Sequence, residues 1–141
     1  MALFPNLVFN DNGQFQNCTA LQEVTTPPKY TNMNNYPFNG CSSMTKLRMP
    51  NVTAIRYAGL RIPCGNGRCI LYLPAQFTAF DNYWNYDNNK YTLIMASETV
   101  LANNPGNGAY AVYVPDTAVD AYKAAWSSIA SKIHPMSEYE E

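Results

Sequence analysis

The stretch FQNCTALQEVTTPP, from Phe15 to Pro28, is the best guide to the fold, because FNGCSSMTKLRMPN repeats it at residues 38–51. The two copies begin 23 residues apart and keep their aromatic, cysteine, aliphatic and proline positions in step. The matched pairs are Phe15 with Phe38, Cys18 with Cys41, Leu21 with Met44, Val24 with Leu47, and Pro27 with Pro50. A period of this length is typical of a solenoid, in which each repeat buries its apolar face against its neighbours.

A short alternating segment that ends near a proline recurs along the chain. Its copies occupy residues 23–27, 46–50, 70–74 and 111–115, with a looser copy at 91–95. Successive side chains of a strand point to opposite faces, so we expect Leu47 and Met49 to face the core. Lys46 and Arg48 should then face solvent. Proline ends each strand because it has no N–H for the ladder. The sequence therefore predicts a mostly β solenoid of about five rungs.

The whole chain, residues 1–141, reads as a single domain. Residues 51–55 are echoed by residues 77–80, and we interpret these segments as the return side of the coil. A glycine-rich turn at residues 63–69 and a polar, aromatic insertion at residues 81–90 interrupt the pattern. The predicted parts are an N-terminal cap at 1–14, a repeat solenoid at 15–115, a capping helix at 116–134 and an acidic tail at 135–141.

The predicted helix follows Pro115. Its apolar residues recur every three or four positions and are Val119, Tyr122, Trp126, Ile129 and Ile133. Thr117 with Asp120 resembles an N-terminal capping box, and Pro135 would end the helix. A helix here would cover the open edge of the last rung. We expect the acidic tail after it to be solvated.

Composition argues against several classes of function. Charged residues make up 13% of the chain, against about 25% in an average soluble domain, and the net charge is −1. Nucleic acid is not expected as a partner, because binding phosphates needs a concentrated Lys and Arg face. Membrane insertion is not expected, because no apolar run approaches the ~20 residues that span a bilayer. The first basic residue is Lys29, which does not fit a secretory signal peptide at the N-terminus.

The repeat F-x-x-C-x-x-L-x-x-V-x-x-P and the closing VYVPDTAVDAYKAAWSSIASKIHPM resemble BspA-type leucine-rich repeats. The resemblance is strong over residues 15–60 and 111–136 and loose between them. It implies a short leucine-rich-repeat β-solenoid with a C-terminal capping α-helix. Members of the family are common in gut Bacteroidales, with similar modules in proteins of their phages. They are surface proteins that bind host ligands or partner proteins, and the resemblance brings no catalytic residues with it.

Candidate reactive groups are few. Cys18 and Cys41 occupy equivalent rungs with their side chains side by side, so we expect free thiols. Cys64 and Cys69 could be structural thiols, a local disulfide or half of a zinc site. His134 is the only histidine, so the other half of a zinc site and a base for a nucleophile are both missing. We expect no enzyme activity, no catalytic residue, no metal and no cofactor.

The best candidate for a binding surface is the aromatic insertion. Its candidate residues are Tyr83, Trp84, Tyr86 and Tyr91, set among asparagines and aspartates. Exposed Tyr and Trp offer rigid area with a polar tip to a protein or to the face of a sugar. The structural alternative is that Trp84 and one tyrosine fill the core of a weakened middle rung.

Together these features predict a non-enzymatic protein-interaction or assembly module. Our first hypothesis is a bacteriophage virion structural protein, as a capsid decoration, head-fibre or tail component that docks on coat proteins or on copies of itself. The first alternative is a leucine-rich-repeat module of a bacterial cell-surface adhesin. The second is an intracellular inhibitor that binds another protein.

Overall fold

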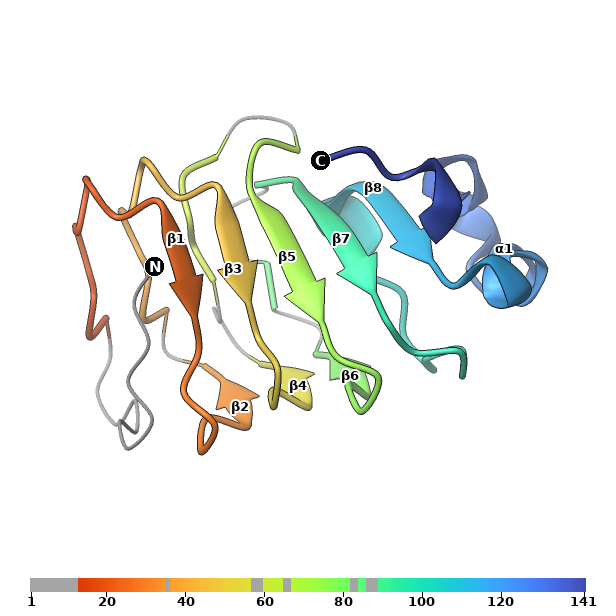
Figure 1. Cartoon of the computed structure of the whole chain (residues 1–141), viewed down its shortest axis with the longest axis horizontal. Helices are drawn as coiled ribbons and strands as arrows, with labels where there is room; N and C mark the ends of the chain where they lie inside the picture. The colour runs from red at the N-terminus through yellow and green to blue at the C-terminus, as the bar shows by residue number, and fades with distance from the viewer. Residues whose placement is uncertain (1–12, 35, 57–59, 65–66, 82–83, 86–88) are drawn as a thin grey trace.

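The computed structural model describes residues 13–34, 36–56, 60–64, 67–81, 84–85 and 89–141. Within these residues two parallel sheets run along the long axis of the molecule (Figure 1). The main sheet has six described strands in chain order: β1 (Glu23–Thr25), β3 (Lys46–Arg48), β5 (Ile70–Leu73), β7 (Tyr91–Met95), β8 (Ala109–Val114) and β9 (Ile133–Pro135). The second sheet has three described strands: β2 (Asn32–Met33), β4 (Ala54–Ile55) and β6 (Ala79–Phe80).

The register of the main sheet confirms the alignment predicted from the repeat. The central residues of its first five strands pair in order and form one column: Val24, Leu47, Leu71, Leu93 and Val112. All of them are buried, with at most 4% of their surface exposed. Lys46 and Arg48 lie on the opposite, outer face, as alternation requires. The sequence therefore fixes which side of each strand faces the core.

The second sheet contains the two segments that we interpret as the return side of the coil. β4 pairs with β6 through Ala54 with Ala79 and Ile55 with Phe80, the match that the sequence predicts. β2 joins the same sheet through Met33, which is fully buried, and no pattern in the sequence pointed to this strand. The core thus lies between the two sheets. The number of rungs stays a prediction. Among the described residues the main sheet has six strands and the second sheet has three, so only some strands of the main sheet have a counterpart in the second.

The Phe-x-x-Cys segments form stacked turns beside the sheets. The rings of Phe15 and Phe38 stack with their centroids 5.7 Å apart. The backbone N–H groups of Phe15 and Asn17 donate to the carbonyls of Pro37 and Asn39, both at 2.8 Å. The thiol of Cys41 donates to the carbonyl of Phe15 over 3.1 Å. Equivalent residues of successive repeats therefore contact each other directly.

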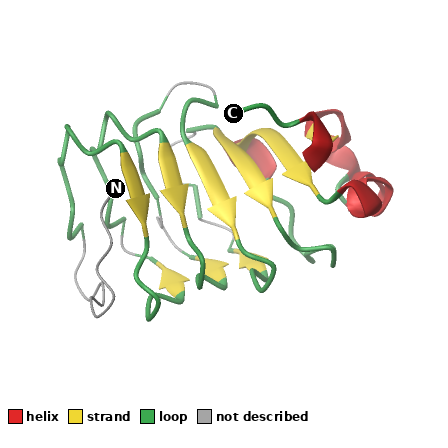
Figure 2. Ribbon diagram, viewed as in Figure 1, coloured by secondary structure: helices red, strands yellow, loops and turns green. Residues whose placement is uncertain are grey.

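The C-terminal region differs from the single helix predicted at residues 116–134. A 3-10 turn (Asp116–Ala118) leads into α1 (Val119–Ala125), and a kinked 3-10 segment (Ser127–Lys132) follows (Figure 2). The last predicted turn is instead β9, which pairs with β8. The predicted capping box is wrong, because Ala118 is the N-cap of α1 and no side chain caps it.

Two buried aromatic residues explain why the C-terminal region still packs on the core. Tyr122 and Trp126 contact each other edge to face at 4.8 Å. The Tyr122 hydroxyl donates to the carbonyl of Ser97 over 2.9 Å, and the Trp126 indole N–H donates to the carbonyl of Leu101 over 3.1 Å. Their apolar spacing was predicted correctly, but the kink after Trp126 turns the chain back into the sheet. No helix in the described part of the chain has the length and apolar character to cross a bilayer.

Candidate functional site

The outer face of the main sheet carries a groove with a volume of about 310 Å³. The groove crosses the C-terminal ends of the strands β1, β3, β5 and β7. Its lining residues are Thr25, Arg48, Met49, Pro50, Tyr72, Leu73, Pro74, Ile94 and Ala96. Most of these side chains are apolar, while Arg48 and Tyr72 supply a cation and a hydroxyl. We call this feature the outer groove.

A charged cluster adjoins the outer groove. It consists of Glu23, Lys46, Arg48 and Tyr72, which occupy outward positions on three neighbouring strands. The carboxylate of Glu23 lies 3.6 Å from the Lys46 ammonium and 3.5 Å from the Arg48 guanidinium. The Arg48 guanidinium also lies over the Tyr72 ring, 4.8 Å from its centroid. Cation–π contact of this kind orients both side chains on the sheet.

The acidic tail is largely exposed to solvent, as we expected, but its last residue also contacts the outer face of the main sheet. The Glu141 carboxylate lies 2.6 Å from the Lys46 ammonium and 3.8 Å from the Arg48 guanidinium. The Tyr72 hydroxyl donates to the same carboxylate over 3.2 Å and lies 3.3 Å from the Tyr139 hydroxyl. This contact has a physical reason, because the outer face offers two cations and the tail offers a carboxylate that can reach both.

These contacts shift the ionisation of the groups involved. The hydrogen bond from Lys46 lowers the pKa of Glu141, and the same hydrogen bond raises the pKa of Lys46. Desolvation, followed by the hydrogen bond with Tyr139, raises the pKa of the Tyr72 hydroxyl. The charged forms of Glu141 and Lys46 are therefore the ones that favour the contact.

Further contacts fix the start of the tail beside β8 and β9. The backbone N–H of Ser137 donates to the Asp116 carboxylate over 3.0 Å, which lowers the pKa of Asp116. The Tyr139 ring lies 5.0 Å from that of Tyr113 on β8. The ring centroids of His134 and Tyr113 lie 5.4 Å apart, and Nδ1 of His134 lies 3.8 Å from the Glu138 carboxylate. The segment Ser137–Glu141, which we call the tail, thus follows the outer face for several strands.

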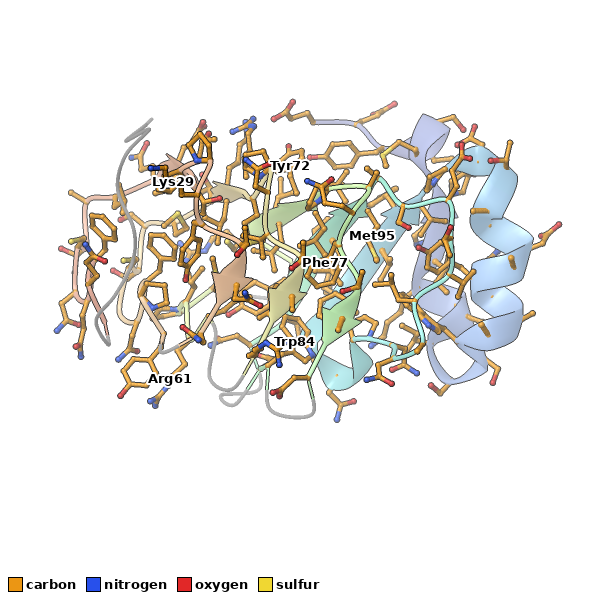
Figure 3. The ribbon with its side chains drawn as sticks, turned by 90° about the horizontal axis from the view of Figure 1, so that it is seen from below. Lys29, Arg61, Tyr72, Phe77, Trp84 and Met95 are labelled. Carbon is orange, nitrogen blue, oxygen red and sulfur yellow. The ribbon has the colours of Figure 1, made fainter. Side chains whose placement is uncertain are left out.

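The described part of the aromatic insertion lies away from the outer face (Figure 3), and its two candidate residues are buried. Trp84 and Tyr91 are buried, with 5% and 0% of their surface exposed, and their rings lie 5.9 Å apart. Neither ring can serve as an exposed anchor, so the structural alternative holds for these two residues. Figure 3 shows Trp84 on the opposite side of the molecule from Tyr72. Tyr83 and Tyr86 lie outside the described residues, and their predicted role stays a prediction.

Trp84 is held by specific contacts. Its ring packs 4.7 Å from that of Phe80, and its indole N–H donates to the carbonyl of Pro105 over 3.1 Å. A Cβ atom on Gly108 would clash with the Trp84 ring, so glycine is required at this position. A cavity of about 300 Å³ lies beside the ring and is lined largely by asparagine and glycine, including Asn85 and Asn104.

All four cysteines are described and free. Cys18 is exposed, Cys64 is half-buried, and Cys41 and Cys69 are buried. Burial raises the pKa of Cys41 to about 11 and raises the pKa of both Cys64 and Cys69. Buried thiols with raised pKa values are poor nucleophiles and poor ligands. Among the described residues, no three His, Cys, Asp or Glu side chains group as metal ligands would.

Parallel strands in register with the sequence repeat, together with stacked Phe-x-x-Cys turns, define a repeat protein built from parallel β-sheets. In agreement, residues 9–58 match the family described as "BspA type Leucine rich repeat region (6 copies)". This match confirms the resemblance over the first repeats and assigns residues 9–58 to that family, while the resemblance over residues 111–136 stays a prediction. Searches of curated proteins and of solved structures found no match. The repeat type indicates a protein-interaction module.

Sequence reasoning missed the outer groove and the tail contact. A signal was present, since Lys46, Arg48 and Tyr72 all fall at outward positions of the predicted alternation. Stacking the repeats in register would have placed them side by side. The partner carboxylate on Glu141 lies far along the chain, and no local pattern connects it to these strands.

Proposed function

We propose that this chain is a non-enzymatic assembly module that binds partner proteins through the outer face of its main sheet. The observation that carries the proposal is the outer groove, an apolar recess bordered by Arg48 and Tyr72. Arg and Tyr are enriched among the residues that contribute most to protein–protein binding. Apolar area beside such residues is the arrangement expected of a docking site.

We further infer that the partners are coat proteins and that the chain is a structural component of a bacteriophage virion. The proposal rests on what the sequence resemblance implies, namely similar modules in phage proteins, and on a surface rich in neutral polar residues, since only 13% of the chain is charged. A decoration, head-fibre or tail component would be present in several copies, and contacts between copies belong to the proposal. Nucleic acid is not a proposed partner, because the net charge is −1.

Two experiments test the proposal at its two levels. Mass spectrometry of purified phage particles should detect the chain, and its absence from particles, with recovery from bacterial envelopes instead, would replace the virion role by the adhesin role.

For the docking face, Ala96→Glu adds a charge at an exposed position of the outer groove. We expect it to reduce retention on particles at least tenfold, because it buries an unpaired charge in the interface. Ala124→Glu, at an exposed position of α1, is the matched control and should retain binding.

A further inference from the structure

We propose that the outer face binds an extended peptide segment of the partner that carries acidic and tyrosine side chains, and that the tail is an intramolecular ligand competing for this site. The inference rests on the proposed function, because it names the chemistry that the docking face recognises. It also adds a regulatory property, since the partner must displace the chain's own Ser137–Glu141.

The charge of the face selects an acidic ligand. Without the tail, the charged cluster has two cations, Lys46 and Arg48, and one carboxylate, Glu23. One positive charge is then left uncompensated beside an apolar groove. Glu141 supplies the missing carboxylate and contacts both cations. A partner that replaces the tail must supply the same charge, or it leaves Lys46 and Arg48 facing one carboxylate.

The aromatic side chains of the face select a tyrosine. Tyr139 of the tail contacts the ring of Tyr113 at 5.0 Å and the hydroxyl of Tyr72 at 3.3 Å. Aromatic pairs of this geometry add to binding beyond the area they cover. The tail therefore displays, in cis, the two kinds of side chain that the face accommodates.

The tail is held by contacts that a partner can replace. The side chain of Glu141 is 52% exposed, and those of Lys46 and Arg48 are 24% and 34% exposed. Ion pairs this accessible to water contribute little to stability. The outer groove stays open with the tail in place, although Arg48 and Tyr72 belong to both features. A longer peptide could bind the charged cluster and fill the groove, which gives it an advantage over the tail.

The test uses a fluorescein-labelled peptide with the tail sequence, Ser-Glu-Tyr-Glu-Glu, added in trans to the full chain. Fluorescence anisotropy is measured on the unchanged chain and on the double variant Tyr139→Ala with Glu141→Gln. A tethered ligand competes at an effective concentration in the millimolar range. For a peptide with a dissociation constant near 0.1 mM, we therefore expect about tenfold tighter binding to the double variant. Adding Arg48→Gln to the double variant should abolish this gain.

Matched controls separate specific from non-specific attraction. The peptide Ser-Gln-Tyr-Gln-Gln should bind at least tenfold more weakly, and Lys123→Gln on α1 should leave binding unchanged. Equal affinity for the unchanged chain and the double variant, or equal affinity for both peptides, would overturn the inference. Urea unfolding of each variant verifies that it is folded. The proposed function fails by a different result, namely particle retention that is insensitive to Ala96→Glu, so the two failures can be told apart.

Discussion

Replacing Leu71 by alanine tests the interior column against a control on the same strand. Leu71 is fully buried and lies between Leu47 and Leu93 in the parallel ladder. Its neighbour Ile70 points to the outer face and is half-exposed. Both substitutions replace a four-carbon aliphatic side chain on β5 by a methyl group, so they differ mainly in the side of the sheet that they affect.

The magnitude follows from burial. Leu71→Ala loses about 2.4 kcal/mol of transfer free energy for three carbon groups, at about 0.8 kcal/mol each. The remaining cavity adds to this, because packed neighbours collapse only in part, and measured Leu→Ala changes run from about 2 to 5 kcal/mol. We expect the free energy of unfolding to fall by about 3 kcal/mol for Leu71→Ala and by less than about 1 kcal/mol for Ile70→Ala.

The assay is equilibrium unfolding in urea, followed by tryptophan fluorescence and by circular dichroism. For a chain of this size about 3 kcal/mol corresponds to a fall of roughly 6–12 °C in Tm. Losses of equal size for the two variants would refute the assignment of inward and outward positions. A small loss for Leu71→Ala alone would show that the column is not packed as the register requires.

Three further predictions concern the core, the thiols and the tail. Trp84→Ala should reduce the free energy of unfolding by about 3–5 kcal/mol, since it removes a buried ring and an indole hydrogen bond; a loss below about 1 kcal/mol would contradict its burial. In native protein a thiol reagent should label Cys18 first and Cys69 only after addition of denaturant, as mass spectrometry of digests would show; early labelling of Cys69 would be inconsistent with its place in the core. The pKa of Glu141 is lowered by its contact with Lys46, so this contact stabilises the folded tail fully when the pH is above the ordinary carboxyl pKa of about 4.3. The stabilisation is lost as the pH falls through the lowered pKa of the folded state. Backbone NMR shifts of the tail should therefore change as pH falls below about 4, and a Glu141→Gln chain that changes in the same way would exclude this carboxylate as the cause.

The repeat predicts the main sheet well, because alternation and the following proline are properties of each strand alone. Leu47 and Leu71 could be aligned without any knowledge of the fold. β9 was missed because Ile133 continues the helical spacing of the preceding apolar residues, although the backbone leaves the helical conformation at Trp126 and again at Ile129. β2 was missed because Asn32 stands where the two recognised strands of this sheet have an alanine, Ala54 and Ala79.

The candidate site was harder to predict than the main sheet, because it depends on contacts between residues that are far apart in the sequence. The sequence around Trp84 does not show whether an aromatic ring is exposed or buried. Trp84 is buried because Gly108, which is distant in sequence, leaves room for its ring. The tail contact joins Glu141 to Lys46 across most of the chain. Acidic residues in a polar segment are usually solvated, and only the stacked geometry brings two cations within reach of this one.

We propose that partners dock on the outer face of the main sheet. The most direct test of this claim is photo-cross-linking in the native assembly, with benzoylphenylalanine incorporated at position 96 in the outer groove or at position 124 on α1. We expect position 96 to form a covalent product with a second protein chain and position 124 to form none. A product from position 124, with none from position 96, would contradict the claim and move the docking surface to the C-terminal end of the molecule.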